Sequence, residues 1–209
     1  REISMSVVRV LKHRPLTDSQ RAATMRFFED RERARADDSR AHPDDGRYRD
    51  HNLLILQLEA VEEWVVGARV HGQPIMPFLE SLVPSAYYYP NIFDQTAAAS
   101  TADCEYLVLN SQHPLPTRAV AFHHEENRFV ALASVLRDHG YRTVSMHGYR
   151  RGMWNRALLH PAYGFQHSLF GEQLGEEPRI GWGLADRVFF RKAVEELATL
   201  ENPYFALLI

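Results

Sequence analysis

The sequence has one cysteine, two lysines and no long hydrophobic run. Because Cys104 is alone, an intramolecular disulfide framework and a cysteine-based zinc site are both excluded. No apolar stretch approaches the roughly 18 residues that a membrane-spanning helix requires. Acidic residues outnumber basic residues by 27 to 24, which disfavours a uniformly basic nucleic-acid-binding protein. We therefore expect no nucleic acid as a partner.

Apolar side chains are plentiful, and charges are unevenly distributed. Apolar residues make up 45% of the 209 positions, which is enough for a sizeable folded core. The first 50 residues contain 12 basic and 10 acidic side chains, whereas the later part of the chain has most of the long apolar segments. We expect a charged linker or helical arm over residues 1–50 and a folded domain over residues 51–209.

From residue 51 onward, strand and helix patterns alternate. Apolar runs predict strands over 53–58, 87–93, 141–146 and 203–209, the first of them buried on both faces. Helical spacing predicts helices over 74–82, from residue 101, over 127–139 and over 185–200, after a charged helix over 20–35 capped by Thr17 or Asp18. The alternation favours an α/β fold with a doubly wound, mainly parallel sheet flanked by helices. Because the chain stops inside its last strand, we expect the domain to be truncated at its C-terminal end.

Two oxygen-bearing side chains occupy positions suited to chemistry. Glu59 directly follows the strand over 53–58, where a carboxylate is well placed to hold a hard or borderline cation. The alternative is an acid at the start of a helix, stabilised by the helix dipole. Thr101 follows small residues at a predicted helix start, where backbone N–H groups can face a phosphate and a metal can activate the hydroxyl as a nucleophile. The alternative is plain N-capping by Ser100 or Thr101.

A second group of side chains follows the strand over 141–146. His147 comes directly after this strand, and Trp154 and Arg156 come shortly after it. Arg156 is suited to grip a phosphate through a bidentate fork, and Trp154 to wall a pocket. The alternative is a buried tryptophan beside a surface arginine. A shared site is favoured because Glu59, Thr101 and His147 all fall at one edge of the predicted sheet.

Short motifs in residues 50–209 occur in a recognisable order. They are Leu-Glu at 58–59, the segments 74–79 and 95–105, Leu-Asn-Ser at 109–111, Pro-Leu-Pro at 114–116, His-Gly at 147–148, Trp-Asn-Arg at 154–156, Gly-Leu-Ala-Asp at 183–186 and the strand at 203–209. In order and spacing, they resemble the motifs of lipoteichoic acid synthases and related phosphoglycerol transferases. That family belongs to the alkaline phosphatase/sulfatase superfamily.

The resemblance implies a metal-dependent enzyme that transfers a glycerophosphoryl group from phosphatidylglycerol to a polyol or glycan, such as polyglycerolphosphate. It implies that Thr101 is the nucleophile, and that Glu59 and Thr101 bind Mn²⁺ or Mg²⁺. It also implies that His147, Trp154 and Arg156 line the phosphoglycerol pocket, and that the protein acts at the extracytoplasmic face of the cell membrane. The alternatives are a phosphodiesterase or sulfatase-type hydrolase of the same superfamily and a non-catalytic glycolipid-binding domain.

The sequence departs from the family pattern in three ways. Ala97, Ala98 and Ala99 replace the glycine-rich approach to the threonine. The membrane helices of the family are missing from these residues. The family's remaining metal ligands, an Asp-His pair and a further histidine, are expected beyond Ile209. We therefore expect these 209 residues alone to be inactive.

Overall fold

The computed structural model describes residues 16–37, 44–175 and 178–209, and the chain divides into two units at residues 49 and 50. The first unit contains helix α2 (Asp18–Asp37). Thr17 caps it, because the Gln20 N–H donates to Thr17 Oγ1 at 3.2 Å while Gln20 Oε1 accepts from the Thr17 N–H at 3.0 Å. The predicted helix and its threonine cap are both confirmed. No helix in the described parts of the chain is long and apolar enough to cross a membrane.

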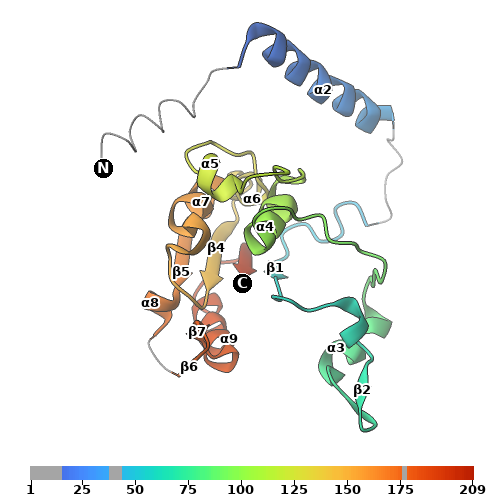
Figure 1. The fold of residues 1–209 in the computed structure, drawn as a ribbon, viewed down its shortest axis with the longest axis vertical. Coiled ribbons are helices and arrows are strands. Elements are labelled where there is room, and N and C mark those ends of the chain that lie inside the picture. Colours follow the sequence, from blue (N-terminus) through green and yellow to red (C-terminus); the bar gives the residue numbers. More distant parts are fainter. Residues whose placement is uncertain (1–15, 38–43, 176–177) are drawn as a thin grey trace. The chain divides into compact units, whose positions relative to one another are not determined.

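Four parallel strands form the centre of the second unit (Figure 1). Their order across the sheet is β1 (Leu53–Leu56), β8 (Tyr204–Leu208), β4 (Arg142–His147) and β5 (His167–Phe170). All three neighbouring pairs are parallel, so the carboxyl ends of the strands lie at one edge. Two small antiparallel pairs accompany the sheet: β2 (Arg69–Val70) with β3 (Gln73–Pro74), and β6 (Arg179–Ile180) with β7 (Gly183–Leu184).

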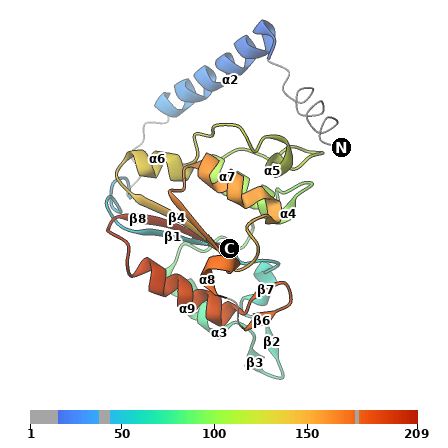
Figure 2. The ribbon, with the colours of Figure 1, turned by 90° about the vertical axis from the view of Figure 1, so that its left-hand side faces the viewer.

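Helices cover both faces of this sheet (Figure 2). Alternate residues of β8 point to opposite faces, as the two-residue period of a strand requires. Phe205 and Leu207 pack into one core with α4 (Ser100–Asn110), α5 (Val120–His123), α6 (Leu132–Asp138) and α7 (Arg156–Tyr163). Ala206 and Leu208 pack into the other core with α9 (Asp186–Leu197). The expected doubly wound α/β architecture is confirmed.

The shorter elements complete the second unit. They are α3 (Pro77–Leu82), α8 (Gly171–Leu174) and three short 3-10 helices, at Glu63–Val65, Val83–Ser85 and Met153–Asn155. Helix α3 begins later than predicted because residues 73–74 form strand β3. Helix α6 covers only the second half of the stretch predicted over 127–139.

Two predictions about strands were wrong. Strand β1 is not buried on both faces: Leu53, Leu54 and Leu56 are exposed, because β1 lies at the edge and pairs only with β8 among the described strands. Residues 87–93 form no strand, and the chain turns at Pro90. The apolar composition of this segment suggested a strand, but proline cannot donate a hydrogen bond to a sheet.

Candidate functional site

Three segments deliver polar side chains to the carboxyl edge of the sheet. Glu59 follows β1, Thr101 is the second residue of α4, and His147 is the last residue of β4. Ile209 directly follows β8, which lies between β1 and β4 in the sheet. The parallel sheet therefore places Glu59, Thr101 and His147 at one edge, as the sequence predicted.

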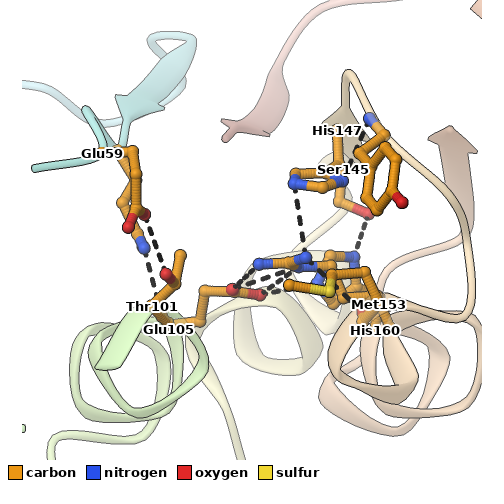
Figure 3. Close-up of polar contacts among 10 residues, drawn as sticks. Glu59, Thr101, Glu105, Ser145, His147, Met153 and His160 are labelled. Atoms are coloured by element: carbon orange, nitrogen blue, oxygen red, sulfur yellow. Dashed lines mark hydrogen bonds and ion pairs between the residues drawn. The ribbon is translucent and has the colours of Figure 1, made fainter. Parts of the chain in front are cut away.

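Glu59 and Thr101 contact each other directly (Figure 3). The Thr101 hydroxyl donates to Glu59 Oε2 at 2.8 Å. Gln57 joins the two segments, because its side-chain amide donates to the Thr101 carbonyl at 3.1 Å. Its own backbone N–H donates to the Leu208 carbonyl at 2.9 Å, which extends the β1–β8 ladder by one residue. Gln57 thus ties the start of α4 to the edge of the sheet.

The hydroxyl of Thr101 does not cap α4. The N-cap residue is Ala99, and no side chain caps it. The loop before the helix is held instead by Asp103, whose Oδ2 accepts from the backbone N–H groups of Ala97 and Ala99 at 3.0 and 2.9 Å. Asp103 is 1% exposed, so this anchor lies inside the domain. The simple-cap alternative for Thr101 is wrong, and its hydroxyl is free to face Glu59.

Arg156 is more deeply buried than the sequence suggested. It is 1% exposed, and its Nε and Nη2 atoms donate to the carboxylate of Glu105 at distances of 3.1, 3.1 and 2.6 Å. The surface-arginine alternative is therefore wrong, and the bidentate fork expected to grip a phosphate pairs with Glu105 in this structure. The reason lies on α4: Glu105 follows Thr101 by four residues, on the same helix face, and offers Arg156 a carboxylate.

Glu105 has a second buried partner in His160. The His160 Nε2 lies 2.9 Å from Glu105 Oε2, and its Nδ1 lies 2.8 Å from the Ser145 hydroxyl on β4. Because an ionised carboxylate can only accept, Nε2 of His160 carries a hydrogen. Burial by itself raises the pKa of Glu105. The hydrogen bonds from His160 and Arg156 and the charge of Arg156 outweigh burial and hold that pKa at about 2. Glu105 is therefore ionised at neutral pH.

His147 lies beside the free end of Arg156. Its Nε2 is 3.3 Å from Arg156 Nη1, and the Tyr149 backbone N–H points at its Nδ1 from 3.3 Å. Burial, followed by the charge of Arg156, lowers the pKa of His147 to about 4. His147 is therefore neutral at pH 7, and a neutral ring has an acceptor lone pair on only one of its two nitrogens, so it accepts a hydrogen bond from one of these two donors.

The loop after His147 is held by close backbone contacts. The Gly148 carbonyl accepts from the Leu184 N–H at 2.8 Å. A Cβ atom added at Gly171 or Gly183 would lie 2.8 or 2.9 Å from this carbonyl oxygen, so both positions require glycine. Three segments of the chain thus meet at Gly148 and fix where β4 delivers His147.

Trp154 packs against helix α5. Its backbone is left-handed, with φ of 53°, as is that of Asn155. Its ring packs against Phe122 at a centroid distance of 5.5 Å, while the Asn155 side chain donates to the Ala121 carbonyl at 2.9 Å. These contacts fix the turn that leads into α7, so the Trp-Asn pair sets where Arg156 enters its helix.

Sequence reasoning missed Gln57, Glu105, His160 and Ser145. Glu105 and His160 each had a detectable signal. An acid four residues after Thr101 falls on the same helix face, and His160 stands in the same relation to Arg156. Neither signal reveals that the two helices face each other across a buried ion pair.

A cavity of about 870 Å³ lies beside the loop after His147. Its lining residues are Tyr149, Arg150, Glu172, Pro178, Arg179, Gly181 and Trp182. None of the five residues predicted to form the site lines it. In the described ranges, no three His, Cys, Asp or Glu side chains form a group able to hold a metal ion. Glu59 and Thr101 offer two adjacent oxygens, about a third of the roughly six ligands of a typical hard-cation site.

Comparison with known proteins places the second unit in a family. The sulfatase family profile matches residues 51–209. The chain is 25% identical over 169 residues to the lipoteichoic acid synthase-like protein YvgJ of Bacillus subtilis, covering 78% of this chain and 27% of that protein. It is 26% identical over 164 residues to a lipoteichoic acid synthase of Staphylococcus aureus, covering 76% and 25% of the two chains. The chain thus spans about a quarter of the length of the curated relatives it matches.

Solved structures give the same picture. The lipoteichoic acid synthase LtaP of Listeria monocytogenes superposes with a TM-score of 0.75 at 27% identity, over 78% of this chain and 41% of that one. An alkaline phosphatase superfamily protein of Vibrio parahaemolyticus superposes with a TM-score of 0.65 at 24% identity, over 76% and 39% of the chains. The second likeness concerns the fold alone.

Proposed function

Because the chain belongs to the sulfatase family, we propose that the protein containing it transfers a glycerophosphoryl group from phosphatidylglycerol to a polyol or glycan acceptor, such as polyglycerolphosphate. The observation that carries this proposal is the 2.8 Å contact between the Thr101 hydroxyl and Glu59 at the carboxyl edge of the sheet. The names of the lipoteichoic acid synthase relatives support it. The proposed setting is the extracytoplasmic face of the cell membrane, where the lipid donor is accessible.

The proposal includes a divalent cation, Mn²⁺ or Mg²⁺, held by Glu59 and Thr101. A carboxylate and a hydroxyl oxygen suit either ion, since both prefer oxygen ligands. Two oxygens are too few for six-coordinate binding, so water and residues outside the described ranges would complete the site. When bound, the cation would lower the pKa of the Thr101 hydroxyl and make it a competent nucleophile.

In the proposed reaction, Thr101 Oγ1 attacks the lipid phosphorus. A bond forms between Oγ1 and phosphorus, the bond from phosphorus to the diacylglycerol oxygen breaks, and diacylglycerol leaves with the proton that Thr101 gives up. An acceptor hydroxyl then attacks the same phosphorus, the bond between Oγ1 and phosphorus breaks, and the proton of the acceptor hydroxyl returns to Thr101 Oγ1. Before the attack, Glu59 Oε2 orients the hydroxyl by accepting its hydrogen bond.

His147 and Arg156 would receive the phosphoglycerol group in this proposal. His147 is neutral at pH 7, so its ring can pack against a glycerol group without adding charge. Arg156 Nη1 points toward this ring and can donate to a phosphate oxygen. Trp154 would contribute through the turn that places Arg156 on α7.

The test uses the whole protein, Mn²⁺ and fluorescent phosphatidylglycerol, and measures release of diacylglycerol. We expect Thr101→Ala to abolish release, because it deletes the attacking atom and only a few packing atoms. Ser100→Ala is the matched control, since it removes the neighbouring exposed hydroxyl, and it should retain activity. Turnover by Thr101→Ala near the wild-type rate would refute the nucleophile. Release of glycerol phosphate into water, with no acceptor product, would favour the hydrolase alternative.

A further inference from the structure

Glu105 is the most constrained acid beside the candidate site. It lies between two cationic or hydrogen-donating partners, and Glu105, Arg156 and His160 are 1%, 1% and 0% exposed. Four contacts of 3.1 Å or less join Glu105 to Arg156 and His160. A fifth, of 2.8 Å, joins His160 to the Ser145 hydroxyl. Removing this carboxylate would leave the buried charge of Arg156 unpaired.

The pairing settles which part of Arg156 can reach a ligand. Glu105 occupies Nε and Nη2, the edge that normally forks onto a phosphate. Only Nη1 points elsewhere, toward His147 Nε2 at 3.3 Å and the Met153 carbonyl at 3.5 Å. Because Arg156 is 1% exposed, a phosphate beside His147 would meet it through Nη1 by taking the place of one of these two acceptors.

The pairing also cancels charge. Ionised Glu105 and Arg156 carry no net charge together, and His147 adds none at pH 7. A phosphodiester carries one negative charge, whereas a phosphomonoester carries between one and two near neutral pH, because its second pKa is about 6. A site whose arginine is already neutralised has less electrostatic attraction for the second charge of a monoester.

We propose that Glu105 is a positioning and specificity-determining residue. It fixes Arg156 so that Nη1 alone meets the substrate. It also cancels the charge of Arg156, so that the site favours monoanionic phosphodiesters over dianionic phosphomonoesters. This inference rests on the proposed function, and it assigns the preference for the substrate class to one buried carboxylate outside the reacting atoms.

The decisive variant is Glu105→Gln, measured in the whole protein. Glutamine keeps the shape of the side chain: its oxygen can accept from Arg156, and its amide can donate to His160 in the other tautomer. Arg156 then carries an uncompensated charge. With bis-p-nitrophenyl phosphate as the diester and p-nitrophenyl phosphate as the monoester, we expect the monoester-to-diester ratio of kcat/KM to rise roughly tenfold or more at pH 8. An unchanged ratio in folded protein would overturn the proposal.

Two further variants separate charge from structure. Glu105→Asp keeps the charge but shortens the side chain, so kcat should fall while the ratio stays near the wild-type value. The double variant Glu105→Gln with Arg156→Gln leaves no buried charge unpaired, and it should fold even if Glu105→Gln alone does not. Its activity should be low with a ratio near wild type. A double-variant ratio shifted toward the monoester would contradict the charge argument, and equal losses on both substrates in every variant would indicate a purely structural role.

A binding measurement distinguishes this proposal from the proposed function. Calorimetry on wild type and Glu105→Gln would use glycerol phosphate as the monoester and glycerophosphoglycerol as the diester. We expect glutamine to strengthen monoester binding relative to diester binding by the same roughly tenfold factor. If the wild-type protein binds the diester but releases no diacylglycerol, the transferase proposal fails while the role of Glu105 is still tested. If relative affinities are the same in both proteins, the role of Glu105 fails.

Discussion

Thr101 and Glu59 are 42 residues apart in the sequence, yet the threonine hydroxyl donates directly to the glutamate carboxylate. The contact depends on the parallel pairing of β1 with β8, which places the end of β1 beside the start of α4. A cation bound there would be held by ligands from two separate segments, so a change in either segment should weaken it.

The first prediction concerns Glu59. Replacing it with glutamine keeps its size but removes the negative charge that attracts a divalent cation, so Mn²⁺ affinity should fall roughly tenfold or more. Titration of the whole protein with Mn²⁺, followed by electron paramagnetic resonance, measures this affinity. Glu62→Gln is the control, because Glu62 is an exposed neighbouring acid that bonds to Trp64. Equal Mn²⁺ affinity in wild type and Glu59→Gln would exclude Glu59 as a ligand.

The second prediction concerns Gln57. Its side chain tethers the Thr101 carbonyl, while its backbone continues the sheet. Gln57→Leu should leave the ladder intact but loosen the placement of Thr101, and we expect kcat to fall roughly ten- to a hundredfold. Thermal unfolding should change little. Gln73→Leu, at an exposed position of β3, serves as the matched control. A kcat in Gln57→Leu equal to that of the control would show that the tether is dispensable.

The third prediction concerns pH. The pKa of His147 in the folded chain is about 4, below its ordinary value near 6.5, so the unfolded chain binds more protons between these values. The stability that neutral His147 contributes is therefore complete above pH 6.5 and is lost as the pH falls toward 4. As the pH falls from 6.5 to 4, the free energy of unfolding of the wild-type protein should decrease by at most about 3 kcal/mol more than that of His147→Asn.

Urea unfolding of both proteins at pH 4 to 7 measures the difference. The stabilisation from Glu105, whose pKa is about 2, begins to be lost only below about pH 4.5, and both proteins share this loss, so it cancels in the comparison. Parallel pH profiles for wild type and His147→Asn would show that the ring is not held neutral by the fold.

The fourth prediction concerns Asp103. Its buried carboxylate holds the amides of Ala97 and Ala99 and so shapes the approach to Thr101. Asp103→Ala should destabilise the domain by about 1–3 kcal/mol, because the buried N–H of Ala99 loses its acceptor, as does the N–H of the more exposed Ala97. Hydrogen exchange at these two amides should accelerate. Asp103→Asn retains an acceptor oxygen and should show smaller effects on both measurements. Unaltered exchange in Asp103→Ala would remove Asp103 as the anchor of the loop.

The sequence predicted the elements whose signal is local. Thr17 and Gln20 marked the start of α2, and helical periodicity marked α9. The motif order also led to the family, and strand ends led to the Glu59–Thr101 contact. These predictions were correct because each depends on a short segment or on the general rule that the carboxyl ends of parallel strands lie at one edge of the sheet.

The remaining features depend on contacts that no local pattern contains. The exposure of β1 follows from its place at the sheet edge, which alternation of residues cannot reveal. The orientation of Arg156 follows from Glu105 on another helix, 51 residues away. Helix α7 was not predicted from the sequence. It contains Pro161, and proline is unfavourable in the interior of a helix.

The pairing of β1 with β8 also governs the order of assembly. Leu53 pairs with Phe205, 152 residues later in the sequence, so this pairing cannot form until residue 205 has been synthesised. Until residues 204–208 have been synthesised and inserted between β1 and β4, Gln57 has no sheet partner and Glu59 is not directed toward Thr101. The Thr101 hydroxyl and the Glu59 carboxylate are therefore expected to come together only after residues 204–208 have joined the sheet.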